Sequence, residues 1–206
     1  MKILFTILLL LIPVSAIPQQ KAPEPTLTKA EHDKAVKLLL DSQKETLDAV
    51  SKLSDAQWNY KVSPEKWSAG QVAEHIYLAE SLLFASVEKA MASPENEAWY
   101  EETKGKDEFL QKILLDRSGK AQAPEAIKPT GKTRAEIIKG LKESRAKTLK
   151  FLNDNKVPMK NHTLVHPFKI FGTLNAYQWL IYIPLHNMRH NQQIMEVKNS
   201  PGFPKA

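Results

Sequence analysis

The 206-residue sequence contains no cysteine. This absence excludes disulfide bonds, thiolate metal ligands and cysteine nucleophiles. Any transition metal in this protein must therefore be held by histidine and carboxylate side chains. Without disulfides the fold must be stabilised by an ordinary hydrophobic core, and a chain of this length is long enough to bury one.

The sequence also lacks a dense run of Lys and Arg interleaved with aromatic residues. The formal net charge is +6, but the lysines are scattered, and several of them fall in predicted loops. Nucleic-acid binding requires a concentrated basic patch, so we expect no nucleic-acid partner and interpret the charge as a solvated surface. The expected partner is a small-molecule substrate or ligand, and a homodimer remains open.

Only one long apolar run is present, and it is too short to span a bilayer comfortably. It covers residues 3–14, follows Lys2, and leads into Val14-Ser15-Ala16. This pattern predicts a signal peptide over residues 1–16, cleaved after Ala16, and hence export to the periplasm or the medium. The alternative is an uncleaved N-terminal anchor. Residues 17–27 are predicted to form a flexible leader, and we expect no stable membrane insertion after cleavage.

The remaining sequence is dominated by helical periodicity. Capping boxes at Thr28, Ser68 and Thr133 precede apolar residues at helical spacing. A fourth helix is predicted to start at Thr173, and no segment alternates apolar and polar residues over a useful strand length. The predicted main helices span residues 28–53, 68–92, 133–153 and 173–198. Residues 28–200 are thus expected to form one all-α domain, a four-helix bundle with long crossover connections.

The sequence also predicts a short helix in the longest connection and a kink in the last helix. The long connection 93–132 is expected to contain a short helix over residues 107–116. Pro184 falls inside the last helix, where it removes one backbone donor, and it is predicted to kink that helix near Leu180.

Three histidines are candidates for a metal site. His186 and His190 are four residues apart on one helix face, on an apolar stripe that turns both imidazoles toward the interior. His75 lies beside the apolar stripe of a separate helix. Three imidazoles from facing helices would leave one coordination position open, as in water-activating metal sites. The alternative for each is an ordinary polar residue at the rim of the core.

The neighbours of these histidines limit the chemistry. Asn187 follows His186 where a zincin metalloprotease has glutamate, which argues against that class. Gln193, one turn beyond His190, is placed to orient a ligand or a water molecule. Glu74 is the nearest acid, but adjacent helix positions diverge by about 100°, so we do not expect it to reach the metal. No catalytic residue is assigned.

The other histidines carry less information. His32 and His162 lack partners at useful spacing and are predicted to be surface residues. His166 has two interpretations: a turn residue before Pro167, or a residue in the wall of a pocket near the metal.

Two sequence runs resemble a known family. WSAGQVAEHI, residues 67–76, resembles the start of the second helix in the DinB-like superfamily, which includes YfiT-type proteins. LHNMRHNQQI, residues 185–194, is similar to the last-helix motif of that family. His166-Pro167 followed by Gly172 is similar to the loop before that helix. The resemblance extends from Thr28 to Val197.

The resemblance implies a four-helix bundle in which His75, His186 and His190 hold a divalent metal. It also implies a metal-dependent hydrolase or a thiol-dependent transferase or isomerase, acting on a small molecule. The predicted export disfavours the thiol-dependent reactions, because low-molecular-weight thiols are cytosolic reductants. A non-catalytic bundle that binds metal or a small ligand is the alternative. Zinc or nickel is the expected metal, with iron and copper as alternatives.

Overall fold

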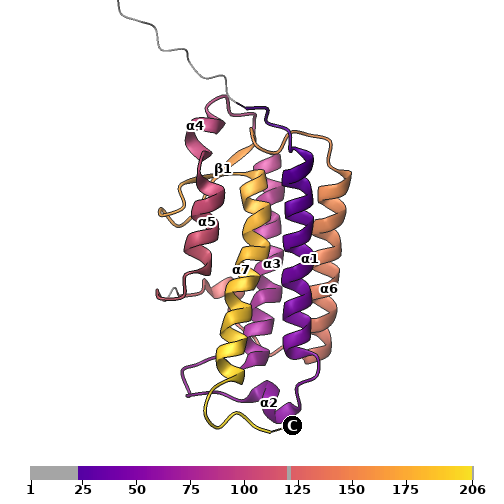
Figure 1. Ribbon diagram of the computed structural model, residues 1–206, viewed down its shortest axis with the longest axis vertical. Helices are drawn as coiled ribbons and strands as arrows, with labels where there is room; N and C mark the ends of the chain where they lie inside the picture. The colour runs from indigo at the N-terminus through magenta and orange to yellow at the C-terminus, as the bar shows by residue number, and fades with distance from the viewer. Residues whose placement is uncertain (1–22, 120–121, 206) are drawn as a thin grey trace, which may run out of the picture.

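The computed structural model describes residues 23–119 and 122–205. The predicted signal peptide and the first part of the predicted leader lie outside the described residues. Four long helices run side by side along the long axis of the molecule (Figure 1). They are α1 (Lys29–Val50), α3 (Ala69–Met91), α6 (Arg134–Asp154) and α7 (Ala176–Lys198). The predicted all-α fold, a four-helix bundle, is confirmed.

Capping boxes begin all four long helices. The side chains of Thr28, Ser68 and Thr133 accept hydrogen bonds from the backbone N–H groups predicted for them. The last helix begins later than predicted, because Asn175 rather than Thr173 is its N-cap residue. A capping side chain satisfies backbone donors that have no partner inside the helix, so these starts are encoded locally.

The connection before α7 contains two strands that were not predicted. Strands β1 (Thr163–Val165) and β2 (Thr173–Asn175) form a two-stranded antiparallel sheet, with Leu164 opposite Leu174. The sequence pattern assigned no strand to this segment. Each strand has three residues, which is too short for the alternation of apolar and polar residues that marks a strand to be recognised in the sequence. Pairing with the other strand, not local preference, holds them extended.

Four shorter helices complete the fold of the described residues. The short helix predicted over residues 107–116 is α5 (Lys106–Leu115). Three others were not predicted, because a single helical turn is too short to show an apolar period. These are α2 (Asp55–Asn59), α4 (Trp99–Thr103) and the 3₁₀ helix η1 (Glu125–Ile127).

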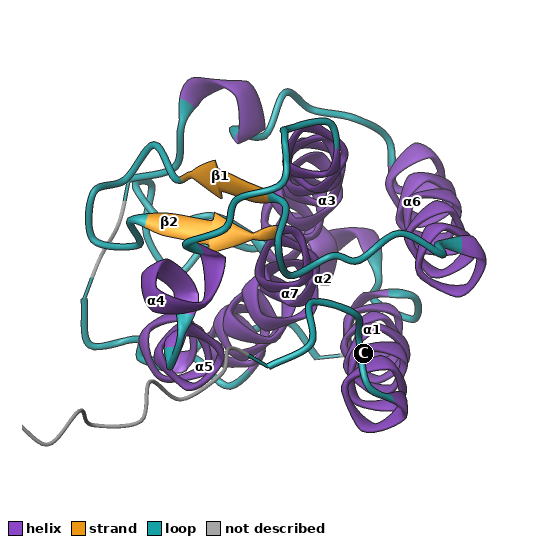
Figure 2. Ribbon diagram, turned by 90° about the horizontal axis from the view of Figure 1, so that it is seen from above, coloured by secondary structure: helices purple, strands orange, loops and turns teal. Residues whose placement is uncertain are grey.

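Helix α7 is the central element of the fold. It packs chiefly against α3 and α1, and α5 covers a further side, an arrangement visible from above in Figure 2. Because it is covered on several sides, its first half is buried almost all round, from Ala176 to Leu185. The helix continues through Pro184, and the kink near Leu180 stays a prediction.

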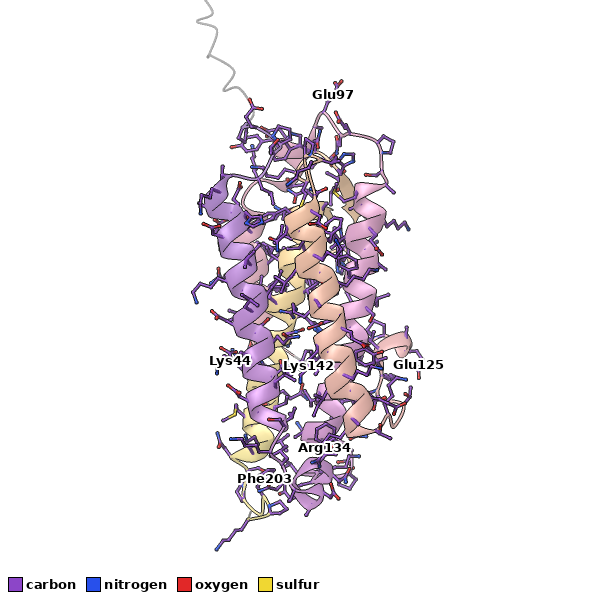
Figure 3. All side chains as sticks on the ribbon, turned by 90° about the vertical axis from the view of Figure 1, so that its right-hand side faces the viewer. Lys44, Glu97, Glu125, Arg134, Lys142 and Phe203 are labelled. Atoms are coloured by element: carbon purple, nitrogen blue, oxygen red, sulfur yellow. The ribbon has the colours of Figure 1, made fainter. Side chains whose placement is uncertain are left out.

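The outer faces of the bundle carry the scattered charges. Lys44 and Lys142 lie on the outside of α1 and α6 (Figure 3). Lys44 pairs with Asp48 one turn further along α1, and both side chains are mostly exposed. Such pairs stabilise a helix weakly. None of the described helices combines the length and the apolar character needed to cross a membrane.

The core is divided into two hydrophobic clusters by a buried polar layer. One cluster includes Leu39, Leu83 and Leu180, and the other includes Val50, Ile76 and Ile194. Along each of the four long helices, buried polar residues lie between the two clusters in sequence. These polar residues include Ser42, Thr46, Glu80, Arg145, Asn187 and Asn191, and the partly buried Ser144 lies beside them.

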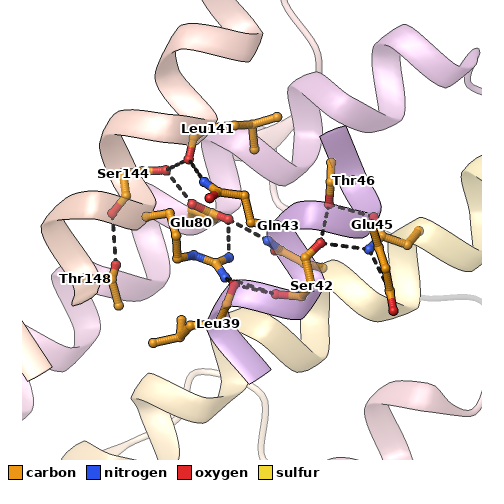
Figure 4. Close-up of polar contacts among 12 residues, drawn as sticks. Leu39, Ser42, Gln43, Glu45, Thr46, Glu80, Leu141, Ser144 and Thr148 are labelled. Carbon is orange, nitrogen blue, oxygen red and sulfur yellow. Dashed lines mark hydrogen bonds and ion pairs between the residues drawn. The ribbon is translucent and has the colours of Figure 1, made fainter. Parts of the chain in front are cut away.

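An ion pair is at the centre of this polar layer (Figure 4). Arg145 and Glu80 are each 1% exposed, and Nη2 of Arg145 lies 2.5 Å from Oε1 of Glu80. The arginine also donates to Oγ of Ser42 at 3.0 Å. Ser144 and Asn187 donate to the Glu80 carboxylate. The network therefore connects α1, α3, α6 and α7 at one level of the bundle.

Candidate metal centre

Three histidines converge where α3 faces the second half of α7. His75 comes from α3, and His186 and His190 come from consecutive turns of α7. One nitrogen from each ring lies within 4.8 Å of the corresponding nitrogens of the other two. Nε2 of His75 is 3.1 Å from Nε2 of His190, although 115 positions separate them in the chain. The structure thus brings together all three candidate residues of the sequence.

Burial differs among the three rings. His75 is only 2% exposed, whereas His186 and His190 are partly exposed. The indole of Trp67 packs against His75 with ring centroids 5.0 Å apart. The phenol ring of Tyr182 stacks on His186 at 6.3 Å. The cluster is therefore flanked by aromatic rings, and two of its three residues keep some exposure to solvent.

Hydrogen bonds orient two of the rings. Nδ1 of His75 lies 2.7 Å from the backbone carbonyl of Ile127. A carbonyl only accepts, so Nδ1 carries the proton and Nε2 of His75 presents a lone pair to the cluster. Nδ1 of His190 lies 2.8 Å from Oε1 of Gln193. An amide oxygen also only accepts, so Nδ1 of His190 carries the proton and its Nε2 has the lone pair. Gln193 thus contacts His190, one of the candidate metal ligands.

The donor set fits a metal cation. With both Nδ1 atoms donating, the Nε2 atoms of His75 and His190 face each other at 3.1 Å with lone pairs only. Nδ1 of His186 is buried and has no hydrogen-bond partner among the described residues. Facing lone pairs and an unpartnered buried nitrogen are unfavourable, and a shared cation relieves the repulsion between the lone pairs.

The imidazoles are neutral at neutral pH. Burial lowers the pKa of His75 below its ordinary value. Burial, and then the neighbouring His75, lower the pKa of His190 to about 3. Burial and the two other imidazoles hold the pKa of His186 well below its ordinary value. The neutral imidazole is the form that ligates metals, because a protonated ring nitrogen has no lone pair.

The remaining histidines lie elsewhere. His32 is partly exposed on α1. The prediction of a surface position was wrong for His162, which is 8% exposed and has Nδ1 2.7 Å from the carbonyl of Ser93. An isolated β-bridge between Glu95 and His162 holds it there, a contact between segments that spacing does not reveal.

His166 belongs to a stack of rings that leads toward the cluster. It is 5% exposed, and it stacks on Trp179 at 4.8 Å and on Tyr182 at 5.6 Å. Tyr182 in turn stacks on His186. His166 therefore precedes the bend at Pro167, and Tyr182 lies between its ring and that of His186. Its place in the wall of a pocket stays a prediction.

Comparison with known proteins identifies the family. A model of the DinB superfamily matches residues 38–194, which include all three histidines. The chain belongs to the DinB superfamily. The uncharacterised protein YuaE of Bacillus subtilis (strain 168) is 24% identical to it over 163 residues, which are 77% of this chain and 93% of YuaE.

A solved structure supports the fold of this DinB superfamily protein. YfiT from Bacillus subtilis, described as a probable metal-dependent hydrolase with an unusual four-helix bundle topology, is similar with a TM-score of 0.58. The similarity covers 88% of this chain and 93% of YfiT at 15% sequence identity. At that identity the likeness shows the fold alone.

The connection between α5 and α6 is held against α7 beside the three histidines, and the sequence did not predict this. Arg189 donates to the carbonyls of Leu114 at 3.1 Å and Gly119 at 2.9 Å. Arg117 forms a bidentate ion pair with Glu196 on α7. These bonds hold the connection against α7 beside the cluster. Backbone carbonyls are present at every position of a chain, so no sequence signal marks the ones that are used.

Proposed function

We propose that this DinB superfamily protein binds a divalent metal through His75, His186 and His190. The observation that carries the proposal is the convergence of three neutral imidazoles, one nitrogen each within 4.8 Å of the others. Nitrogen donors of this kind suit zinc or nickel, with iron and copper as alternatives. The fold it shares with YfiT, described as a probable metal-dependent hydrolase, supports the same class of site.

We propose further that the metal serves hydrolysis or group transfer on a small molecule. When bound, such a metal acts as a Lewis acid and can lower the pKa of a bound water to about 7. His75 and His190 are held by Ile127 and Gln193 in the tautomer that keeps Nε2 free. Among the described residues, no fourth histidine or carboxylate joins the cluster, so one coordination position is left for water or substrate.

A non-catalytic role as a metal- or ligand-binding bundle is the second candidate. One observation favours it: the described residues place no carboxylate in the cluster to act as a general base. Glu74, the acid next to His75, is occupied by donors from residues 130–132. A screen of the metal-loaded protein against ester, amide and phosphoester substrates separates the candidates. Turnover that disappears in His186→Ala identifies an enzyme.

Elemental analysis of the purified protein and its variants tests the metal site. We expect one equivalent of a divalent transition metal, and a sharp loss of it in each of His75→Ala, His186→Ala and His190→Ala. His32→Ala and His162→Ala are the controls, and they should retain the metal. His162 is buried, so the metal content is normalised to folded protein. If His32→Ala lost metal as severely as His190→Ala, the ligand assignment would be wrong.

Thermal unfolding provides a second readout of the same site. The ligands come from two helices far apart in the chain, so the metal binds the folded state selectively. At a hundredfold excess over Kd, this selectivity adds about 2.7 kcal/mol to the free energy of unfolding. For a protein of this size that corresponds to about 5–10 °C in Tm. We expect a chelator to lower Tm by such an amount in the wild type and to have no effect on His186→Ala.

A further inference from the structure

The last residue of η1 and the short loop after it contact two consecutive residues of α3. We call residues 127–132 the clamp loop. Its first residue, Ile127, offers its carbonyl to Nδ1 of His75. Its last three residues, Thr130, Gly131 and Lys132, donate to the carboxylate of Glu74. The same loop therefore orients a proposed metal ligand and encloses the acid next to it.

The carboxylate of Glu74 is the anchor of the clamp loop. Glu74 is 2% exposed. Oε1 accepts from N–H and Oγ1 of Thr130, both at 2.8 Å, and from N–H of Lys132 at 3.2 Å. Oε2 accepts from N–H of Gly131 at 3.1 Å. Gly131 has a φ of 92°, a left-handed conformation that is unfavourable for residues other than glycine. This conformation lets successive N–H groups converge on one anion.

The charge state of Glu74 strengthens this anchor. Burial raises the pKa of Glu74, but the hydrogen bonds from Thr130, Lys132 and Gly131 outweigh burial and bring the pKa below its ordinary value. The group is thus an ionised carboxylate that accepts four hydrogen bonds. Hydrogen bonds to an ionised acceptor are roughly twice as strong as those between neutral groups. Only Lys128 and Pro129 separate Ile127 from Thr130, so the chain between the anchored residues and the Ile127 carbonyl is short.

We infer that Glu74 is a positioning residue for the metal centre: it holds the clamp loop so that the Ile127 carbonyl keeps the His75 ring in place. This inference rests on the proposed metal-binding function. Adjacent positions on α3 diverge by about 100°, so Glu74 acts through the loop and not on the metal. The carbonyl of Ile127 fixes the proton on Nδ1 of His75 and leaves Nε2 free. Loss of such an outer partner typically weakens metal affinity by about 10–100-fold.

The test compares Glu74→Gln with a matched control, Glu136→Gln. Glu136 accepts from N–H of Thr133 at 2.8 Å and from its hydroxyl at 2.6 Å. That is the same pair of donors that Thr130 gives Glu74, but Glu136 is exposed at the start of α6. Zinc affinity is measured by competition with a chromophoric chelator. We expect it to fall about 10–100-fold in Glu74→Gln and to stay within about twofold of wild type in Glu136→Gln.

A second readout separates positioning from general destabilisation. In the metal-free protein, ¹⁵N NMR of the imidazoles should show His75 as the Nδ1–H tautomer in wild type and in Glu136→Gln. In Glu74→Gln we expect a mixture of tautomers. If Glu74→Gln does not fold, Thr130→Val removes only one donor of the anchor, and it should weaken zinc binding in the same direction.

Two results would overturn the inference. One is wild-type zinc affinity together with an unchanged His75 tautomer in folded Glu74→Gln. The other is an equal loss of affinity in Glu136→Gln. A wild-type protein that binds none of zinc, nickel, iron and copper contradicts the proposed function instead, and the tautomer measurement, which needs no metal, still decides the positioning role of Glu74.

Discussion

Replacement of Arg145 by methionine tests whether the buried polar layer stabilises the bundle. Arg145 and Glu80 are each 1% exposed, and Arg145→Met keeps most of the length of the side chain but removes the charge. Among the described residues, the Glu80 carboxylate then retains only the donors of Ser144 and Asn187. A charge in the protein interior without its counterion is strongly unfavourable, because little solvent is present to stabilise it.

The size of the effect follows from this burial. Removing one partner of a buried ion pair typically costs about 3–5 kcal/mol. For a protein of this size that lowers Tm by about 6–20 °C. The double variant Glu80→Leu/Arg145→Met removes both charges. It should therefore lose less stability than the two single variants lose together, because no uncompensated charge remains.

The assay is urea unfolding followed by circular dichroism at a fixed metal concentration. Lys147→Met is the matched control, because Lys147 and Glu88 also join α6 to α3, at 2.9 Å, with side chains 62% and 49% exposed. It should cost about 1 kcal/mol or less. A loss below 1 kcal/mol in Arg145→Met, or strictly additive losses in the double variant, would refute the reasoning.

Two further predictions concern acid and export. The metal-free protein should lose stability as pH falls below 6.5, the ordinary pKa of an unfolded histidine, because the folded state holds the pKa of His166 at about 4 and that of His190 at about 3. The unfolded chain binds more protons across that window, so stability rises with pH there. Urea midpoints between pH 7.5 and 5 should depend less on pH in His190→Asn, and equal slopes in both proteins would contradict this. N-terminal sequencing of exported protein should begin at Ile17; an intact Met1 would exclude cleavage.

The sequence by itself determined the features that depend on near neighbours. The capping boxes at Thr28, Ser68 and Thr133 lie within one turn of the groups they satisfy, so the starts of three helices could be predicted. The spacing of four between His186 and His190 placed both on one face of α7 for the same reason. His75 was a weaker inference from its position beside an apolar stripe, supported by the resemblance to a family.

The tertiary structure alone decided what depends on contacts between distant segments. The β1–β2 pair and the burial of His162 result from backbone pairing between separate segments, which leaves no period in a short stretch of sequence. The carbonyl of Ile127 orients His75 across 52 positions, and Glu74 meets its donors across 56 to 58 positions. Carbonyl and N–H groups are the same in nearly every residue. Only the packed fold determines which of them reach the metal centre.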